Sequence, residues 1–282
     1  MNDTQFDSDG LRAYYAGGGG HDEWARLTTQ PGAVEWAVNT DAIAACLPPG
    51  ARVLDIGGGP GRYAIWLAAR PSRHAGRSLA GPAGYRARPD AQAGVGALVE
   101  DIIEADARDL TRWPDDSFDA ALSLGPFYHL PDPADRERAA AELARVLHPG
   151  GLAFVALMPR YTLLRRTLSL PDERRRLAQP VFVRQLLDDG VFENDMPGRF
   201  TNVYGVRVEE VAPFFARHGF AHVALLGSQG ILAGLEDAIT TLARDDPPGY
   251  RAALDLAIQT ANDPSILGLC NHLLYVGRKG TA

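Results

Sequence analysis

The sequence predicts an α/β fold built around a doubly wound, mostly parallel sheet. Segments of strand and helix character alternate from residue 51 onward, which is the pattern of a sheet with helices on both faces. A glycine-rich turn directly follows the first predicted strand. The chain has 282 residues, of which 46% are hydrophobic, and this is enough to bury one large core. We therefore expect residues 1–282 to form a single domain.

The predicted elements divide this domain into four consecutive parts. Residues 1–47 are predicted to form a helical N-terminal cover, 48–159 a ligand-binding core, 160–205 an insertion, and 206–282 the rest of the core. Because open α/β sheets bind ligands at the carboxyl ends of their strands, we interpret the insertion, which follows the fifth strand, as a lid. Periodicity and turn residues place strands at 51–56, 102–104, 118–124, 152–157, 221–226 and 272–277, and helices at 62–70, 135–147 and 208–218, with two further helices before the last strand.

The amino-acid composition indicates which kinds of molecule the protein is expected to bind. The net charge is −7, whereas a nucleic-acid surface needs clustered positive charge. The only two cysteines, Cys46 and Cys270, lie far apart and lack metal-ligand spacing, which fits a reducing compartment. The sequence contains neither a signal-peptide core nor an apolar stretch of about 20 residues. We therefore expect a cytoplasmic monomer or homodimer that acts on a small molecule, without a metal, a nucleic acid or a membrane partner.

The strongest motif is the turn at residues 53–61, VLDIGGGPG. Glycines between a strand and a helix let a ligand approach the backbone closely, because no Cβ blocks it and positive φ is permitted. The helix start beyond the turn offers free N–H groups and a partial positive charge. We therefore predict that Gly57, Gly59 and Gly61 line a cofactor site.

Two cofactors compete for such a turn. In one register Gly59, Gly61 and Ala64 satisfy the dinucleotide fingerprint G-x-G-x-x-G/A, but that register places Pro60 in the tight turn. Asp55 ends the preceding strand, and its carboxylate repels a pyrophosphate but orients the ammonium of a methionine moiety. Asp55 therefore favours a sulfonium cofactor, and a tight turn without a ligand is the third alternative.

Four segments in order resemble the class I (Rossmann-like) S-adenosylmethionine-dependent methyltransferases. The glycine turn resembles motif I of this family, and residues 144–151, ARVLHPGG, resemble a turn that is common in it. Residues 103–107, IEADA, and 118–124, FDAALSL, resemble the ends of two further strands. The resemblance implies S-adenosyl-L-methionine as the cofactor and a seven-stranded, mostly parallel Rossmann-like methyltransferase sheet whose last strand is antiparallel.

The same resemblance implies roles for individual residues. The aspartate of the first of these strand-end motifs, here Asp106, binds the adenine amino group, and Ala107 lies beside it. The end of the fourth strand, here Leu124, lies next to the transferring methyl group. We therefore count Asp55, Asp106, Ala107 and Leu124 with the glycines as cofactor-binding candidates.

Residues 71–90 depart from the family pattern. The family's second strand ends in Asp or Glu, which binds the ribose hydroxyls, but there is no acidic residue between Arg62 and Pro89. The segment PSRHAGRSLAGPAGYRARP also has no β-branched residue. We interpret it as the product of a shifted reading frame and expect a degraded central strand. Loss of one charged hydrogen bond, about 1.5–3 kcal/mol, is expected to weaken cofactor binding by about one to two decades.

Candidates for the chemistry follow the fourth strand. His129 is a candidate general base because its ordinary pKa suits neutral pH; filling a polar niche or capping a helix is the alternative. Its neighbour Tyr128 is a candidate substrate residue, within GPFYHL at residues 125–130. This segment only faintly resembles the (N/D)PP(Y/F) site of amino-group methyltransferases, because the leading Asn or Asp is absent.

Further candidates lie before and after the core. Tyr15 is expected to shield the sulfonium through a cation–π contact, and Arg26 to pair with the methionine carboxylate; helix packing and a solvated charge are the alternatives. In the insertion we expect Tyr161, Phe200 and Tyr204 to line the substrate pocket, with exposed lid surface as the alternative.

The predicted function is methyl transfer from S-adenosylmethionine to an oxygen, nitrogen or carbon nucleophile of a small molecule. The atypical segment 71–90 leaves a second hypothesis, a cofactor-impaired or non-catalytic homologue. Its arginines leave a third, an NADP-dependent oxidoreductase that binds the 2′-phosphate.

Overall fold

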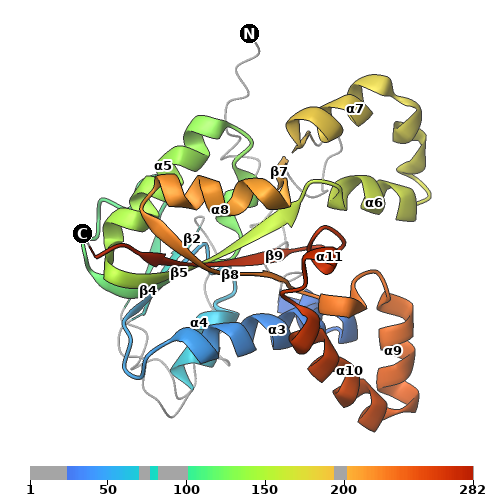
Figure 1. Ribbon diagram of the computed structural model, residues 1–282, viewed down its shortest axis with the longest axis horizontal. Helices are drawn as coiled ribbons and strands as arrows, with labels where there is room; N and C mark the ends of the chain where they lie inside the picture. The colour runs from blue at the N-terminus through green and yellow to red at the C-terminus, as the bar shows by residue number, and fades with distance from the viewer. Residues whose placement is uncertain (1–23, 70–76, 82–100, 194–201, 282) are drawn as a thin grey trace.

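A computed structural model describes residues 24–69, 77–81, 101–193 and 202–281. Its centre is one sheet whose seven main strands lie in the order β3-β2-β1-β4-β5-β9-β8, flanked by helices on both faces (Figure 1). The strands are β1 (Val53–Ile56), β2 (Arg77–Gly81), β3 (Asp101–Glu104), β4 (Phe118–Ser123), β5 (Leu147–Pro159), β8 (Phe220–Gly227) and β9 (Leu273–Lys279).

The strand directions follow the predicted pattern. β1 pairs in parallel with β2 and β4, β2 with β3, and β4 with β5. β9 is antiparallel to both of its neighbours, β5 and β8. The prediction of a mostly parallel, seven-stranded sheet with an antiparallel last strand is therefore confirmed.

The expectation of a degraded second strand is wrong. Residues Arg77–Gly81 pair in parallel with β1 on one side and β3 on the other. The ladder needs only backbone N–H and C=O groups, and pairing on both sides compensates for the absence of β-branched side chains. The strand nevertheless ends at Gly81, so no acidic side chain stands at its carboxyl end. Residues 71–76 and 82–90 lie outside the described part.

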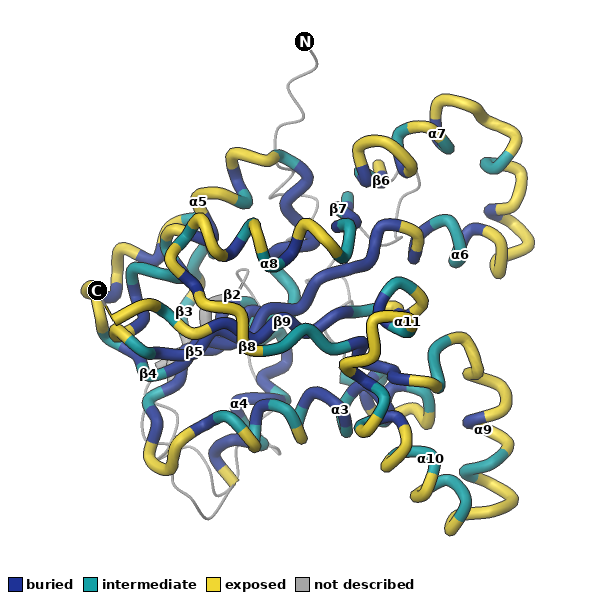
Figure 2. The backbone as a smooth tube through the Cα atoms, viewed as in Figure 1, coloured by how far each residue is buried: buried dark blue, intermediate teal, exposed yellow. Residues whose placement is uncertain are grey.

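Two apolar layers hold the sheet. On one face α5 (Pro133–Val146) and α8 (Val208–Arg217) contribute side chains such as Leu143 and Phe215 to a buried cluster with β1, β4, β5 and β9. On the other face α3 (Gln30–Cys46) and α4 (Arg62–Ala68) contribute Ile43 and Leu67. Figure 2 shows the central strands as buried between these helices.

The N-terminal cover is held by helices from the end of the chain. α9 (Glu236–Asp245) and α10 (Pro247–Thr260) pack through Ile239 and Ala257 against Val34 and Val38 of α3. The short α11 (Pro264–Leu267) then leads to β9. Three α-helices therefore lie where two were predicted. The described residues contain no helix that is both long and apolar enough to span a membrane.

The segment predicted as a lid leaves the sheet at the end of β5. It contains α6 (Thr162–Ser169), the 3-10 helix η4 (Arg174–Ala178), α7 (Pro180–Arg184), the π-helical turn η5 (Gln185–Asp189), β6 (Val191–Phe192) and β7 (Val203–Val206). β7 pairs with the last two residues of β5, and β6 pairs with β7. Arg160 joins the two ends of the insertion, because its side chain donates to Gly205 O at 2.6 Å and to Asp188 O at 2.7 Å. The role of this segment as a lid remains a prediction.

Candidate active site

The predicted glycine turn connects β1 to α4. Gly57, Gly59 and Gly61 have φ values of 68°, 51° and 75°, and Gly61 is the N-cap of α4. Residues other than glycine rarely adopt this backbone conformation. The three glycines are therefore what lets the chain reverse within five residues, 57–61, between a buried strand and a helix.

The turn is closed on one side and open on the other. A Cβ on Gly57 would lie 2.6 Å from Cγ of Pro126, in the loop that follows β4. A Cβ on Gly59 would meet no described atom closer than the Gly57 carbonyl oxygen at 4.0 Å. The described residues thus leave space beside Gly59 for the close approach of a ligand to bare backbone.

Two buried polar side chains lie at the carboxyl ends of the neighbouring strands β1 and β4. Asp55 is 2% exposed and Ser123 is 1% exposed, and Ser123 pairs in register with Ile56. Within the described residues, the Ser123 hydroxyl has no hydrogen-bond partner. A polar atom that is buried without a partner costs free energy, so Ser123 is a plausible contact for a bound group. Leu124 follows it directly and is half-buried.

The predicted Asp106 and Ala107 follow β3. Arg108 binds Asp106 through Nη2–Oδ2 at 2.6 Å and also reaches Asp135 of α5 at 2.7 Å. Burial alone would raise the pKa of Asp106. The hydrogen bonds from Arg108 lower this pKa by more than burial raises it, so the net pKa lies below the ordinary value. Asp106 is therefore an ionised acceptor whose position is set by Arg108.

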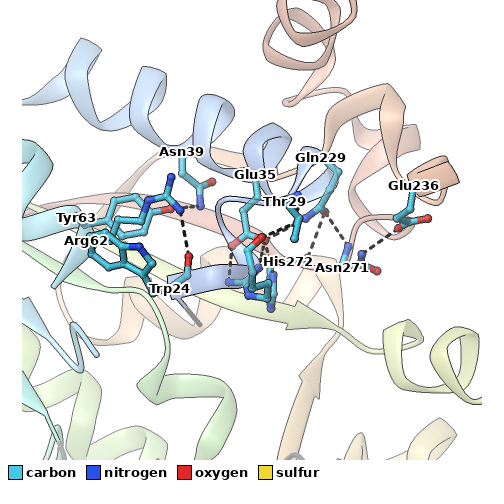
Figure 3. Close-up of polar contacts among 12 residues, drawn as sticks. Trp24, Thr29, Glu35, Asn39, Arg62, Tyr63, Gln229, Glu236, Asn271 and His272 are labelled. Carbon is cyan, nitrogen blue, oxygen red and sulfur yellow. Dashed lines mark hydrogen bonds and ion pairs between the residues drawn. The ribbon is translucent and has the colours of Figure 1, made fainter. Parts of the chain in front are cut away.

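Arg26 contacts Glu35, which lies in a polar cluster with Gln229 and His272 (Figure 3). Its guanidinium donates to both oxygens of Glu35 on α3, at 2.9 and 3.2 Å. Glu35 also accepts hydrogen bonds from Gln229 Nε2 at 3.3 Å and from His272 Nδ1 at 3.0 Å. Arg26 therefore pairs with Glu35, and its predicted contact with a ligand carboxylate stays a prediction.

His129 and Tyr128 belong to the 3-10 helix η3 (Pro126–His129), directly after β4. Burial lowers the pKa of His129 to about 4, and a backbone hydrogen bond with Asn202 opposes this shift. A base works best with a pKa near the operating pH, so this environment does not favour the predicted role of His129. The Tyr128 ring stacks on His272, with centroids 5.6 Å apart and planes at 28°.

The remaining predicted substrate residues are dispersed. Tyr161 precedes α6 and is 44% exposed. Tyr204 lies in β7 under the guanidinium of Arg136, which is 3.6 Å from its ring centroid. Tyr15 and Phe200 lie outside the described residues. The role of Tyr161 and Tyr204 in a substrate pocket stays a prediction.

Residues 54–155 match the family model described as a methyltransferase domain. This range contains the glycine turn, Asp106 and the end of β4, in the order that the sequence motifs require. Over these residues the chain is therefore similar to methyltransferase domains.

Two curated relatives of this chain align over part of their length. Methyltransferase GfsG of Streptomyces halstedii is 34% identical over 122 residues, which cover 40% of each chain. An uncharacterized methyltransferase of Mycobacterium sp. (strain JLS) is 38% identical over 109 residues, 39% of each chain. The chain thus matches about two fifths of the length of each of these relatives.

Solved methyltransferases share the fold over most of the chain. The S-adenosylmethionine-dependent methyltransferase of Mesorhizobium loti has a TM-score of 0.56 at 22% identity, covering 89% of this chain and all of its own. The 1,6-didemethyltoxoflavin-N1-methyltransferase of Burkholderia thailandensis has a TM-score of 0.55 at 15% identity, covering 97% of this chain and 88% of its own. Neither the family match nor these structures favour an oxidoreductase.

The sequence patterns did not single out Glu35, Gln229 and His272, which the structure brings together. One feature of the sequence indicates a special role for Glu35: it is an acidic residue within the apolar helical segment AVEWAV at 33–38. His272 shows no such feature, since it resembles any polar residue at the start of a strand. Ser123 lies within the fourth-strand motif FDAALSL, which by itself gives no sign of a role for its hydroxyl.

Proposed function

We propose that this protein transfers a methyl group from S-adenosylmethionine to a small-molecule acceptor. The observation that carries the proposal is the turn after β1, where three glycines have positive φ and no described atom lies closer than 4.0 Å to a Cβ on Gly59, with the buried Asp55 as the last but one residue of the strand. S-adenosylmethionine supplies a methyl group on a cationic sulfur, which a nucleophile can accept by in-line displacement. Positioning is the main demand of such a transfer.

The residues present fit the two ends of this cofactor. The carboxylate of Asp55 suits the ammonium of the methionine moiety, because a buried anion gains most from a cationic partner. Asp106, ionised and held by Arg108, suits the adenine amino group as a hydrogen-bond acceptor. The missing acid at Gly81 leaves the ribose hydroxyls without the carboxylate that the family resemblance implies.

A small acceptor is the class that the chain's charge supports. The net charge of −7 does not favour a polyanionic substrate. One solved structure of this fold is described with 1,6-didemethyltoxoflavin and S-adenosylhomocysteine bound, so the same architecture holds a small molecule beside the cofactor product in that protein.

Calorimetric titration with S-adenosylhomocysteine tests the cofactor site. We expect one site per chain, and we expect Asp55→Asn to weaken binding by about 10- to 100-fold, because a charged hydrogen bond contributes about 1.5–3 kcal/mol. Asp41→Asn, on the exposed side of α3, is the matched control and should bind as the wild type does. No binding by the wild type at millimolar ligand would favour the cofactor-impaired homologue, and thermal stabilisation by NADPH alone would favour the oxidoreductase.

Restoring the missing acid gives a gain-of-affinity test. Gly81→Asp places a carboxylate at the end of β2, beside the end of β1. We expect the substitution to tighten S-adenosylhomocysteine binding by about tenfold or more, because it adds a charged hydrogen bond to the ribose. Affinity equal to that of the wild type would show that the ribose does not lie against this strand end.

A further inference from the structure

The protonation of the Glu35–His272 pair follows from its surroundings. Burial alone would raise the pKa of Glu35. The charge of Arg26 and the contacts with His272 lower this pKa by more than burial raises it, so the net pKa lies well below the ordinary value. An ionised carboxylate can only accept hydrogen bonds. The proton between the two groups therefore sits on Nδ1 of His272, which is 3.0 Å from Glu35 Oε2. In the neutral ring, Nε2 is then the atom with the lone pair.

Gln229 fixes the geometry of the pair. Its Oε1 accepts from the backbone N–H groups of Asn271 at 2.8 Å and His272 at 3.5 Å. Its amide nitrogen consequently faces Glu35, to which it donates at 3.3 Å. The same side chain thus holds both the backbone of His272 and the carboxylate that receives its ring proton (Figure 3).

A chain of contacts connects His272 to the glycine turn. His272 precedes β9, whose first residue, Leu273, pairs with Leu157 near the end of β5. Its ring stacks on Tyr128 of η3, and the first residue of η3, Pro126, packs against Gly57. His272 therefore lies at the same carboxyl edge of the sheet as the proposed cofactor site.

The side of the His272 ring that carries Nε2 is accessible to a ligand. The His272 side chain is 14% exposed. Among the described residues, none forms a hydrogen bond with its Nε2. Among the described residues, the charged and titratable groups that face His272 are Glu35 with its partner Arg26 on one side, and Tyr128 and His129 of η3 on the other. His129 is fully buried, so His272 is the better placed of the two imidazoles to meet an acceptor.

We propose that His272 is the catalytic base of the methyl transfer, with Glu35 as its positioning residue, and that the acceptor is a molecule whose nucleophilic oxygen or nitrogen carries a proton. This inference rests on the proposed function. The O–H or N–H bond of the acceptor breaks and its proton forms an N–H bond at Nε2. The electron pair left on the acceptor forms the bond to the methyl carbon, and the pair of the methyl–sulfur bond stays on sulfur, which becomes a neutral thioether. Glu35 then balances the charge of the imidazolium.

Nitrogen-15 NMR of the histidine side chains tests the tautomer without any acceptor. In the full-length protein with S-adenosylhomocysteine at pH 8, we expect His272, assigned by its loss in His272→Asn, to carry its proton on Nδ1. Glu35→Leu should abolish this preference, whereas Glu35→Gln, which keeps an accepting oxygen, should retain it. Glu236→Gln, which removes a nearby carboxylate that contacts Asn271 but not His272, is the matched control. A wild-type proton on Nε2 overturns the proposal.

Turnover of model acceptors tests the base itself. With S-adenosylmethionine and a panel of phenols and amines, we expect His272→Asn to lower kcat by about 10²- to 10⁴-fold, as loss of a general base does. Glu35→Gln should lower kcat by about tenfold or more with KM for S-adenosylmethionine unchanged, because the imidazolium loses its counter-charge. Wild-type turnover by His272→Asn, or methylation by the wild type of a thiol or carbon acceptor only, overturns the assignment.

The two proposals fail in distinguishable ways. Absence of S-adenosylhomocysteine binding by the wild type contradicts the proposed function. Normal binding together with the wrong tautomer or an unaffected kcat contradicts only the role of His272. The NMR measurement needs no acceptor, so it decides the tautomer for any outcome of the panel.

Discussion

Gly57→Ala is expected to abolish most cofactor binding and to destabilise the fold. The new Cβ would lie 2.6 and 2.9 Å from Cγ and Cδ of Pro126, at a φ of 68°. The positive φ costs about 1–2 kcal/mol for an alanine, and overpacking against the Pro126 ring costs about 1–3 kcal/mol more. The collision must move either the glycine turn or the loop after β4. We therefore expect S-adenosylhomocysteine affinity to fall by about 100-fold or more in a calorimetric titration.

Gly219→Ala is the matched control for this substitution. Gly219 has a similar φ of 81°, but a Cβ there would meet no atom within 4 Å. We expect it to lose only the conformational cost of about 1–2 kcal/mol in urea denaturation and to bind S-adenosylhomocysteine as the wild type does. Equal affinity losses in both variants would mean that backbone strain, and not the contact with Pro126, controls the cofactor site.

Glu35→Ala is expected to cost about 3 kcal/mol of unfolding free energy at pH 7. Removing one partner of a buried ion pair leaves the others uncompensated, at about 3–5 kcal/mol. The low end applies because Arg26, whose side chain is 36% exposed, can turn to water. Urea denaturation measures the loss, and Glu236→Ala, which removes an exposed carboxylate, should stay within about 0.5 kcal/mol of the wild type.

The contribution of Glu35 has a defined pH dependence. Its pKa in the folded protein lies well below the ordinary value of 4.5. A carboxyl with a depressed folded pKa stabilises fully above its unfolded pKa and loses this effect as the pH falls toward the folded value. We therefore expect the stability difference between the wild type and Glu35→Ala to persist above pH 4.5 and to shrink below it. A difference that grows in acid would contradict the ionised state of Glu35.

The sheet and the glycine turn were predictable because their causes are local. Alternating apolar segments predict strands and helices, and consecutive glycines after a strand predict a reversal with positive φ, as at Gly57, Gly59 and Gly61. The second strand was not predictable, because Arg77–Gly81 lacks strand-forming side chains and its pairing depends on the strands beside it.

The sequence by itself determined the fold class, the cofactor turn and the carboxylate at the end of β1, since these depend on backbone conformation and on hydrophobicity over a few residues. Only the tertiary structure decided which charges meet. Glu35 and Gln229 are 194 residues apart, and Glu35 and His272 are 237 apart. A side-chain type alone does not specify its partner, and burial changes its pKa, so the contacts from which we propose His272 as the base are visible only in the folded chain.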